Sequence, residues 1–268
     1  DAQRAPGSSF KPFVYAAALE AGKTHRNATV VDRQVCIGNW CPQNYGRSFS
    51  GAMPLTTAVA KSINSIPVVM TLQLGQDQHP NHVGRAARAG RDKIVGLLRR
   101  MGVQSDLKDT PSMAIGSVEM TVVEMAQGYG AFPNHGRKVE PYAAVEIRSG
   151  RGELVYRRDR DGPPASQILS RQVAEDMNYL LSKVPEEGTG KRAALGGVRS
   201  AGKTGTTDSY RNAWYVGYTG NFVAAVWLGN DDYSPTSNMT GGSLPAMIWR
   251  EIMTYAHQGV ETKPIPGL

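Results

Sequence analysis

The sequence predicts an α+β fold in which an antiparallel sheet is flanked by helices. Residues 142–158 and 212–229 each place two apolar runs around a short turn, at Ser149–Gly152 and Thr219–Asn221, which predicts two antiparallel hairpins. Helical patterns occupy separate stretches of the chain instead of alternating regularly with these strands. Such segregated blocks are typical of α+β proteins and not of doubly wound parallel sheets.

One helix has a clear start in the sequence. Thr121 and Glu124 have the spacing of a capping box, in which each side chain accepts a hydrogen bond from the other residue's backbone N–H. Met120 and Met125 are placed as a hydrophobic staple across the same boundary. We therefore expect a helix to begin directly after Thr121.

Two further helices are indicated by apolar spacing and by the residues at their ends. Residues 170–185 repeat apolar side chains at helical spacing, and Pro185 and Gly188 are expected to end that helix. A later helix is expected to begin with Ser243 as its N-cap and to stop at Gly259.

The composition is that of an ordinary soluble globular protein, with 40% hydrophobic and 20% charged residues. A chain of 268 residues suits one large domain or two small ones. The longest apolar runs, FVYAAAL and FVAAVWL, fall far short of the about 18 residues that a membrane helix needs. No basic and then apolar leader opens the sequence, so these residues themselves predict neither an anchor nor an export signal.

The chain is basic, with a net charge of +7 and a pI near 9.4, which suits a nucleic acid, an anionic surface or an anionic polymer as a neighbour. The positive charge is scattered, and the densest basic segment, 84–93, has no aromatic residues between its arginines. We interpret that segment as a solvated insertion and expect no nucleic-acid partner. His79 and His82 are interpreted as exposed loop histidines.

Cys36 and Cys41 lie in a loop that is rich in Gly, Asn and Pro. Their spacing permits a short-loop disulfide in an oxidising compartment, and the sequence leaves the state of the pair open. A zinc site is not favoured because no second pair of ligands lies nearby. We expect neither a metal nor a cofactor.

The stretch 196–210 fits two incompatible patterns. Residues 197–204 match G-x-x-x-x-G-K-[ST], the phosphate-binding loop of nucleotide hydrolases. That loop requires a buried strand before it and a helix directly after it. Here the preceding residues are polar and glycine-rich, and the following residues favour extended structure. We therefore expect Lys203 and Thr204 to lie on a β-strand.

The alternative pattern is the Lys-Thr-Gly motif of serine acyl-transfer enzymes, at Lys203–Gly205, whose companion motifs are S-x-x-K and S-x-N. S-x-x-K occurs three times, at Ser8–Lys11, Ser105–Lys108 and Ser200–Lys203, so one match carries little information. The family order places S-x-x-K first, S-x-N second and Lys-Thr-Gly last. Only Ser8–Lys11, followed by Ser62–Asn64 and then by Lys203–Gly205, satisfies this order.

These residue types suit acyl transfer. A helix beginning at about Ser8 directs its dipole toward the alkoxide, and Lys11 lies one turn on, within reach of the Ser8 hydroxyl. Burial and a second cation, Lys203, are expected to lower the pKa of Lys11 enough to make it a base. Ser62 offers a hydroxyl that passes the proton to the leaving amine. Asn64 offers an amide that holds a peptide-like substrate.

The strand that carries Lys203 is expected to complete the site. A backbone N–H near Thr206, together with that of Ser8, can bind the oxyanion. The hydroxyls of Thr204 and Thr206, beside Lys203, suit a substrate's terminal carboxylate. Each of these residues taken singly also has an ordinary role as a cap, turn, strand or surface residue, and the ordered set of three motifs favours function.

The chain resembles the transpeptidase domain of class A penicillin-binding proteins, the bifunctional peptidoglycan synthases. The resemblance runs through nearly the whole chain, in blocks such as RAPGSSFKPFVYAAALE, GAMPLTTAVAKSINSIPVV, GTGKRA and RSAGKTGTTDSYRNAWYVGYTG, in the family's order. It implies attack of Ser8 on the D-Ala-D-Ala end of a peptidoglycan stem peptide, release of D-alanine, and acyl transfer to another strand's amine. It also implies acylation of Ser8 by β-lactams. By this resemblance the catalytic residues are Ser8, Lys11, Ser62, Asn64 and Lys203, and the substrate-binding residues are Thr204, Gly205 and Thr206.

The resemblance further implies one penicillin-binding transpeptidase domain over residues 1–268. Its expected fold is serine β-lactamase/transpeptidase-like and includes a mostly helical subdomain. The family has β-strands before its nucleophile helix, whereas this chain starts seven residues ahead of Ser8. We therefore expect a fragment truncated on its N-terminal side, without those strands, the glycosyltransferase domain and the membrane anchor, and with an exposed sheet edge. The parent protein is expected at the periplasmic face of a bacterial inner membrane.

Two other functions share these motifs. A serine β-lactamase must deacylate, and class A members use a glutamate-activated water. The nearest E-x-x-N pair, Glu175 and Asn178, lies on a predicted amphipathic helix and is interpreted as structural. A non-catalytic β-lactam sensor keeps Ser8 reactive without turnover. The acceptor amine and the oligomeric state are not indicated by the sequence.

Overall fold

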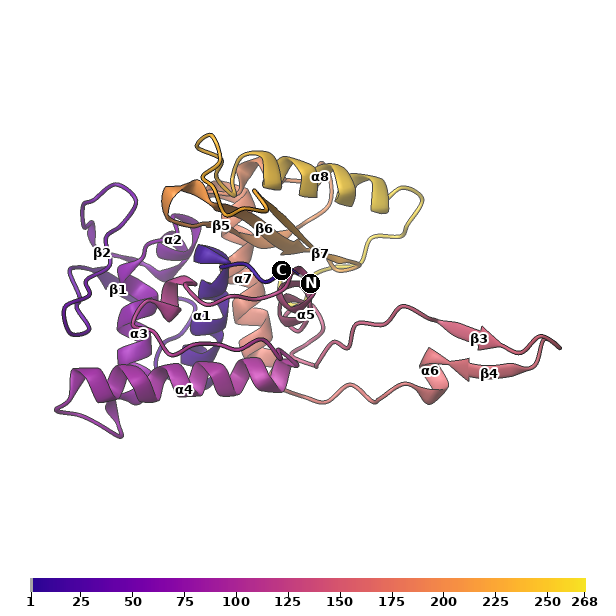
Figure 1. Cartoon of the computed structure of the whole chain (residues 1–268), viewed down its shortest axis with the longest axis horizontal. Coiled ribbons are helices and arrows are strands. Elements are labelled where there is room, and N and C mark those ends of the chain that lie inside the picture. The colour runs from indigo at the N-terminus through magenta and orange to yellow at the C-terminus, as the bar shows by residue number, and fades with distance from the viewer. Residues whose placement is uncertain (1) are drawn as a thin grey trace.

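The computed structural model describes residues 2–268 and confirms the α+β class. It contains a helical body, a small antiparallel sheet and a projecting hairpin (Figure 1). The helices and 3₁₀ turns are η1 (Gly7–Phe10), α1 (Lys11–Glu20), α2 (Leu55–Ala60), α3 (Ser65–Gln76), α4 (Val83–Met101), η2 (Met113–Ile115), α5 (Val122–Gly130), α6 (Arg158–Asp161), α7 (Arg171–Glu187), η3 (Lys191–Ala193), η4 (Asp208–Tyr210) and α8 (Leu244–Ala256). The strands are β1 (Thr29–Asp32), β2 (Gly51–Pro54), β3 (Glu146–Arg148), β4 (Leu154–Arg157), β5 (Ala201–Thr206), β6 (Asn212–Tyr218) and β7 (Val223–Gly229).

Helix α1 runs through the centre of the body. All its residues from Lys11 to Leu19 are buried, because apolar side chains surround it on every side. Phe13 makes edge-on contacts with Phe10 before the helix and with Tyr129 on α5. The central position of α1 fixes the 3₁₀ turn η1 that directly precedes it.

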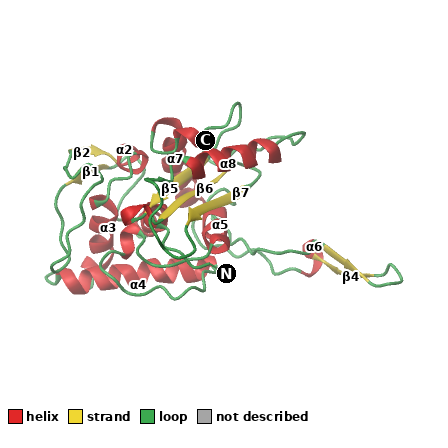
Figure 2. Cartoon of the chain, turned by 45° about the horizontal axis from the view of Figure 1, so that its top comes forward, coloured by secondary structure: helices red, strands yellow, loops and turns green. Residues whose placement is uncertain are grey.

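The sheet has the order β5-β6-β7 and is antiparallel throughout. Every residue of β6 is buried, because the sheet is covered on both faces. Trp214, Val216 and Tyr218 belong to the main core, whereas Tyr215 packs edge-on against Trp249 of α8. Figure 1 and Figure 2 show α8 along one side of the sheet and the helical body on the other. Among residues 2–268 no strand lies outside β7, which is therefore an edge.

The arginine-rich segment 84–93 is helical, which corrects the predicted solvated insertion. It lies in α4, where Arg91 is only 6% exposed and forms an ion pair with Asp109. Gly90 allows α4 to lie very close to α3, since a Cβ there would be 1.8 Å from the carbonyl oxygen of Thr71. Gly90 and Arg91 of this segment therefore serve helix packing, while Arg85 and Arg88 are exposed.

Helix α5 begins as predicted. The Thr121 hydroxyl accepts a hydrogen bond from the backbone N–H of Glu124 at 3.1 Å, and the Glu124 carboxylate accepts one from the N–H of Thr121 at 3.0 Å. Glu124 also accepts from the backbone N–H groups of Gln104 and Ser105. The capping box therefore also ties down the segment that follows α4.

The two later helices keep their predicted starts, and α7 also ends at the predicted Gly188, whereas Pro185 and Gly259 do not end their helices. Helix α7 runs past Pro185 to Glu187, because a proline in a last turn removes a single backbone hydrogen bond. Helix α8 follows Ser243, but the Ser243 hydroxyl donates to the carbonyl of Thr240 and does not cap the helix. The helix ends at Ala256, three residues before Gly259.

Strands β3 and β4 form the predicted hairpin, whose turn is closed by a hydrogen bond from the N–H of Gly152 to the carbonyl of Ser149. The hairpin projects from the body, and its strands contain no buried residue (Figure 1). The second predicted hairpin is β6–β7, closed by the N–H of Thr219 and the carbonyl of Phe222.

The two cysteines and the two histidines singled out in the sequence lie in loops that come before and after α3 in the chain. Cys36 and Cys41 form a disulfide in the loop between β1 and β2. His79 and His82 lie in the turn between α3 and α4; His82 is exposed, and His79 is half-buried. Across residues 2–268, the helices are all too short or too polar to span a bilayer.

Candidate active site

Ser8 lies in the 3₁₀ turn η1, which corrects the expectation that an α-helix begins there; α1 itself starts at Lys11. The turn packs directly on β5. Gly7 has a φ of +54°, and a Cβ on it would lie 2.7 Å from the carbonyl oxygen of Thr206. A Cβ on Gly205 would lie 2.2 Å from the carbonyl oxygen of Pro6. Glycines at both positions thus let Ser8 lie beside the strand that carries Lys203.

The amine of Lys11 is enclosed by the loop between α2 and α3. Its Nζ lies 2.7 Å from the carbonyl oxygen of Ser62 and 3.2 Å from that of Ile63. It also lies 3.2 Å from Oγ of Ser62 and donates to Oδ1 of Asn64 at 2.6 Å. The S-x-x-K and S-x-N motifs therefore meet at one buried amine.

Lys203 reaches the same loop from β5. Its Nζ lies 2.8 Å from Oγ of Ser62 and 3.3 Å from the carbonyl oxygen of Thr204. Lys203 and Lys11 are both fully buried. Ser62 thus stands between two lysines that come from opposite ends of the sequence.

Burial changes the acid–base properties of both lysines. Burial, and then the positive charge of Lys203, lower the pKa of Lys11 well below its ordinary value. Burial lowers the pKa of Lys203 to about 7. Among residues 2–268, no carboxylate forms an ion pair with either lysine. A neutral Lys11 can accept a proton, and a charged Lys203 can attract an anion.

The backbone of the Ser62–Asn64 loop is unusual. Ser62 has a φ of +59°, in the left-handed region that non-glycine residues rarely adopt. Asn64 precedes the first residue of α3, although its side chain does not cap that helix. The left-handed residue turns the loop back on itself, so that its carbonyl groups and side chains surround the amine of Lys11.

Residues Lys203–Thr206 lie on β5, so the strand and not a helix continues directly after Thr204, which rules out the phosphate-binding loop. The Thr204 hydroxyl is 2.6 Å from that of Thr189 and is buried. The Thr206 hydroxyl accepts a hydrogen bond from the N–H of Gly241 at 3.0 Å and keeps its own proton to donate. Thr189 and Gly241 were not anticipated, because neither lies in one of the three motifs.

Sequence reasoning also missed the loop between β1 and β2. Asn44 accepts a hydrogen bond from the backbone N–H of Asn64 at 2.9 Å, and the carbonyl of Gln43 accepts one from Asn64 Nδ2 at 2.6 Å. The next residue, Tyr45, meets Tyr210 with their hydroxyls 2.9 Å apart. No local sequence signal marks these residues, because each acts across a long separation in the chain.

Glu175 and Asn178 have the structural roles that were predicted. Asn178 is fully buried on α7, donates to the carbonyl of Phe132 at 3.2 Å and accepts from the Tyr218 hydroxyl at 2.7 Å. A Cβ on Gly267 would lie 2.8 Å from Cβ of Glu175. This pair therefore lies against the C-terminal segment and not at the lysines.

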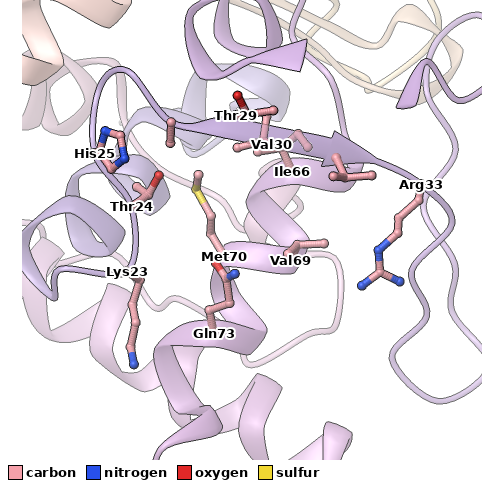
Figure 3. A pocket seen from close by; sticks show the side chains of 12 residues that line it. Lys23, Thr24, His25, Thr29, Val30, Arg33, Ile66, Val69, Met70 and Gln73 are labelled. Carbon is pink, nitrogen blue, oxygen red and sulfur yellow. The ribbon is translucent and has the colours of Figure 1, made fainter. Parts of the chain in front are cut away.

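A cavity of about 390 Å³ lies between β1 and α3, away from this cluster. Figure 3 shows Lys23 and Arg33 at opposite ends of the cavity, with Val69 and Met70 of α3 between them. None of the predicted site residues lines it. We therefore assign the candidate active site to the lysine cluster.

Comparison with known proteins places the chain in a family. Residues 1–254 match the family model of the penicillin binding protein transpeptidase domain. Penicillin-binding protein 1B of Vibrio cholerae is 32% identical over 264 residues, covering 95% of this chain and 32% of that protein. Penicillin-binding protein 1A of Rickettsia prowazekii is 31% identical over 290 residues, covering 98% of this chain and 35% of that protein.

Solved structures share the fold. PonA1 of Mycobacterium tuberculosis, determined in complex with penicillin V, superposes with a TM-score of 0.85 at 23% identity, over 99% of this chain and 72% of that chain. Penicillin-binding protein 1A of Haemophilus influenzae gives a TM-score of 0.79 at 24% identity, over 97% of this chain and 43% of that chain.

Sheet, helices and motif order thus define a transpeptidase domain, as the resemblance implied. The chain belongs to the penicillin-binding protein transpeptidase domain family. It spans about a third of the length of the curated relatives that it matches.

Proposed function

We propose that the domain is a peptidoglycan D,D-transpeptidase that works through an acyl-enzyme on Ser8. The observation that carries the proposal is the meeting of three separate motifs. Lys11 and Lys203 both lie within hydrogen-bond distance of the Ser62 hydroxyl, and the strand that carries Lys203 packs against the turn that holds Ser8. Peptidoglycan cross-linking is the activity that the family implies.

Acylation begins with proton transfer. The Ser8 hydroxyl gives its proton to neutral Lys11, and Ser8 Oγ attacks the carbonyl carbon between the two terminal D-alanines. The tetrahedral intermediate breaks its C–N bond, and the leaving amine takes a proton relayed from Lys11 through the Ser62 hydroxyl. D-alanine departs, and the acyl group stays as an ester on Ser8. The 3.2 Å separation of Lys11 Nζ and Ser62 Oγ supports this relay.

Other groups hold the substrate. The backbone N–H groups of Ser8 and Thr206 bind the oxyanion, since their segments pack directly together at Gly7. Asn64 binds an amide of the donor peptide. Lys203 and the free proton of the Thr206 hydroxyl bind the terminal carboxylate, beside Thr204 and Gly205.

In the second half-reaction the amine of another stem peptide attacks the ester carbonyl. It loses a proton by the same relay, and Ser8 recovers its hydroxyl. β-Lactams carry a comparable carboxylate and a strained amide, so they acylate Ser8 as well. A relative, PonA1, has been solved with penicillin V. Since no carboxylate pairs with the lysines within residues 2–268, we expect slow hydrolysis, which favours a transpeptidase over a β-lactamase.

We also propose where the domain works. The Cys36–Cys41 disulfide suits an oxidising compartment such as the periplasm, where peptidoglycan is cross-linked. The matched relatives are about three times as long as this chain. Residues 1–268 would then form the transpeptidase domain of a longer protein, anchored to the membrane by another part.

The test combines labelling and turnover. A fluorescent penicillin is expected to add its mass at Ser8 and to remain for hours in a chase, and peptide mapping separates Ser8 from Ser9. Ser8→Ala should abolish the label. Ser200→Ala, which changes the serine of the S-x-x-K match that ends at Lys203, should not. A D-Ala-D-Ala donor with an amine acceptor should give the aminolysis product. Loss of label within seconds would favour a β-lactamase, and stable label without aminolysis a sensor.

A further inference from the structure

The loop between β1 and β2, residues 33–50, holds the amide of Asn64 from the side opposite Lys11. Asn64 donates its backbone N–H to Oδ1 of Asn44 at 2.9 Å and its Nδ2 to the carbonyl of Gln43 at 2.6 Å. Its Oδ1 accepts from Lys11 at 2.6 Å. The orientation of the Asn64 side chain therefore depends on the position of this loop.

Asn44 is itself held in one orientation. Its Nδ2 donates to both carboxylate oxygens of Asp32, at 3.0 and 2.9 Å, and to the carbonyl of Ser48 at 2.9 Å. A rotated amide would set its oxygen against the Asp32 carboxylate and its NH₂ against the N–H of Asn64. Only the observed orientation satisfies all the partners of Asn44.

Asp32 anchors the arrangement. It is 2% exposed at the end of β1 and also accepts from the N–H of Ser50 at 2.8 Å and the hydroxyl of Ser65 at 2.5 Å. Burial raises the pKa of Asp32, but hydrogen bonds from Ser65, Asn44 and Ser50 outweigh burial and lower it. The carboxylate therefore joins β1, loop 33–50 and the first residue of α3, beside Asn64.

We propose that Asn44, held by Asp32, is a positioning residue for Asn64 and so for the substrate amide that Asn64 binds. The proposal rests on the function proposed above, because it uses Asn64 as the group that receives that amide. A residue that only stabilised the loop would alter the affinity for every ligand alike. A residue that positions Asn64 alters selectivity between ligands with and without the amide.

Two penicillins separate these roles. Benzylpenicillin carries an acylamino side chain that Asn64 can bind, and 6-aminopenicillanic acid lacks it. Asn44→Ala is expected to slow acylation by benzylpenicillin about 10-fold and acylation by 6-aminopenicillanic acid less than about 2-fold. The measurement is the second-order rate constant for each ligand from competition with a fluorescent penicillin, together with the melting temperature.

Three further proteins complete the design. Asn44→Ala combined with Asn64→Ala is expected to have the ligand ratio of Asn64→Ala alone, since both changes remove one interaction. Asp109→Asn weakens the ion pair of buried Arg91 in α4 and should lower the melting temperature without changing the ratio. Should Asn44→Ala fail to fold, Asn44→Ser keeps a small polar side chain beside Asp32 and should shift the ligand ratio in the same direction.

Equal slowing for both ligands, or additive effects in the double variant, would overturn the positioning role. Failure of the proposed function looks different. In that case Ser8→Ala still accepts the fluorescent penicillin, or Asn64→Ala leaves the ratio of the two ligands unchanged.

Discussion

Lys11 and Lys203 direct their amines at one oxygen, the hydroxyl of Ser62, over 3.2 and 2.8 Å. Two ammonium groups so close together repel, so this pair is most stable when it holds fewer protons than two separate lysines would. Burial and the charge of Lys203 lower the pKa of Lys11, so we expect Lys11 to be the neutral member. The pair then contains one base and one cation.

We expect acylation by a fluorescent penicillin to follow a bell-shaped pH profile. The rate rises as Lys11 loses its proton and falls as Lys203, whose pKa burial lowers to about 7, loses its charge. Second-order rate constants measured across this range test the assignment. Lys203→Arg keeps its charge and should lose the falling limb. A rate in the parent protein that still rises near pH 10 would contradict the charged role of Lys203.

The stability of the fold should also depend on pH through Lys203. An unfolded lysine has a pKa near 10.4, so between about pH 7 and that value the unfolded chain binds more protons than the folded one. Lys203 therefore makes the free energy of unfolding rise with pH in this range, by about 1.4 kcal/mol per unit, and contributes no slope below it. Urea titrations of the parent and of Lys203→Met should show a smaller slope in the variant. Lys183→Met, at a half-buried lysine whose pKa is raised by a hydrogen bond to Glu186, should keep the slope.

Ser62 allows the hydroxyl and the backbone to be tested separately. Ser62→Gly and Ser62→Ala both remove the hydroxyl, and both should slow aminolysis about 100-fold or more. Residue 62 has a φ of +59°, in the left-handed region that glycine adopts freely. Alanine there should therefore lower the free energy of unfolding by about 1 kcal/mol relative to glycine. Melting temperatures should thus rank glycine above alanine while the rates agree. Unimpaired aminolysis in both variants would exclude Ser62 from the proton relay.

Gly7 and Gly22 form a matched pair for testing the contact between η1 and β5. Both have positive φ, +54° and +65°, but a Cβ on Gly7 meets the carbonyl of Thr206 and a Cβ on Gly22 meets nothing within 4 Å. Gly7→Ala is expected to abolish labelling by the fluorescent penicillin, since it moves Ser8 away from β5. Gly22→Ala should label normally. Normal labelling of Gly7→Ala would show that acylation tolerates a wider gap.

Reduction of the Cys36–Cys41 disulfide should loosen loop 33–50. For a loop this short the chain-entropy relation gives a loss of about 2 kcal/mol in the free energy of unfolding. The preference for benzylpenicillin over 6-aminopenicillanic acid should fall in the same samples. A Cys36→Ser, Cys41→Ser variant is the control, because added reductant should not change it. An unchanged preference after complete reduction would show that the disulfide has no part in the positioning of Asn64 by Asn44.

Features of the fold with a local signature were predictable from the sequence. The Thr121–Glu124 capping box and the two hairpins rest on neighbouring residues, and all were found as expected. The segment 84–93 was not, because its glycines and arginines concealed a helix. Gly90 is required there by the nearness of Thr71 on α3, a contact that only the folded chain reveals.

The site residues likewise fall into those that the sequence predicted and those that it did not. Motif order was enough to select the residues that surround Lys11, since each motif is short and contiguous. Asp32 and Asn44 left no such mark, because their partners Asn64 and Ser65 are more than a dozen residues away in the chain. The 3₁₀ geometry at Ser8 was also missed, since the packing of Gly7 on β5 determines it.

Lys11 and Lys203 are buried, and within residues 2–268 no carboxylate is bound to either amine. This has a consequence for the choice of assay buffer. The site therefore carries positive charge that no carboxylate balances, so small buffer anions such as phosphate or sulfate should compete with donor peptides for Lys203. A peptide whose C-terminus is amidated cannot neutralise that charge and should bind poorly. Assays in different buffer salts would then give different apparent affinities for one and the same domain.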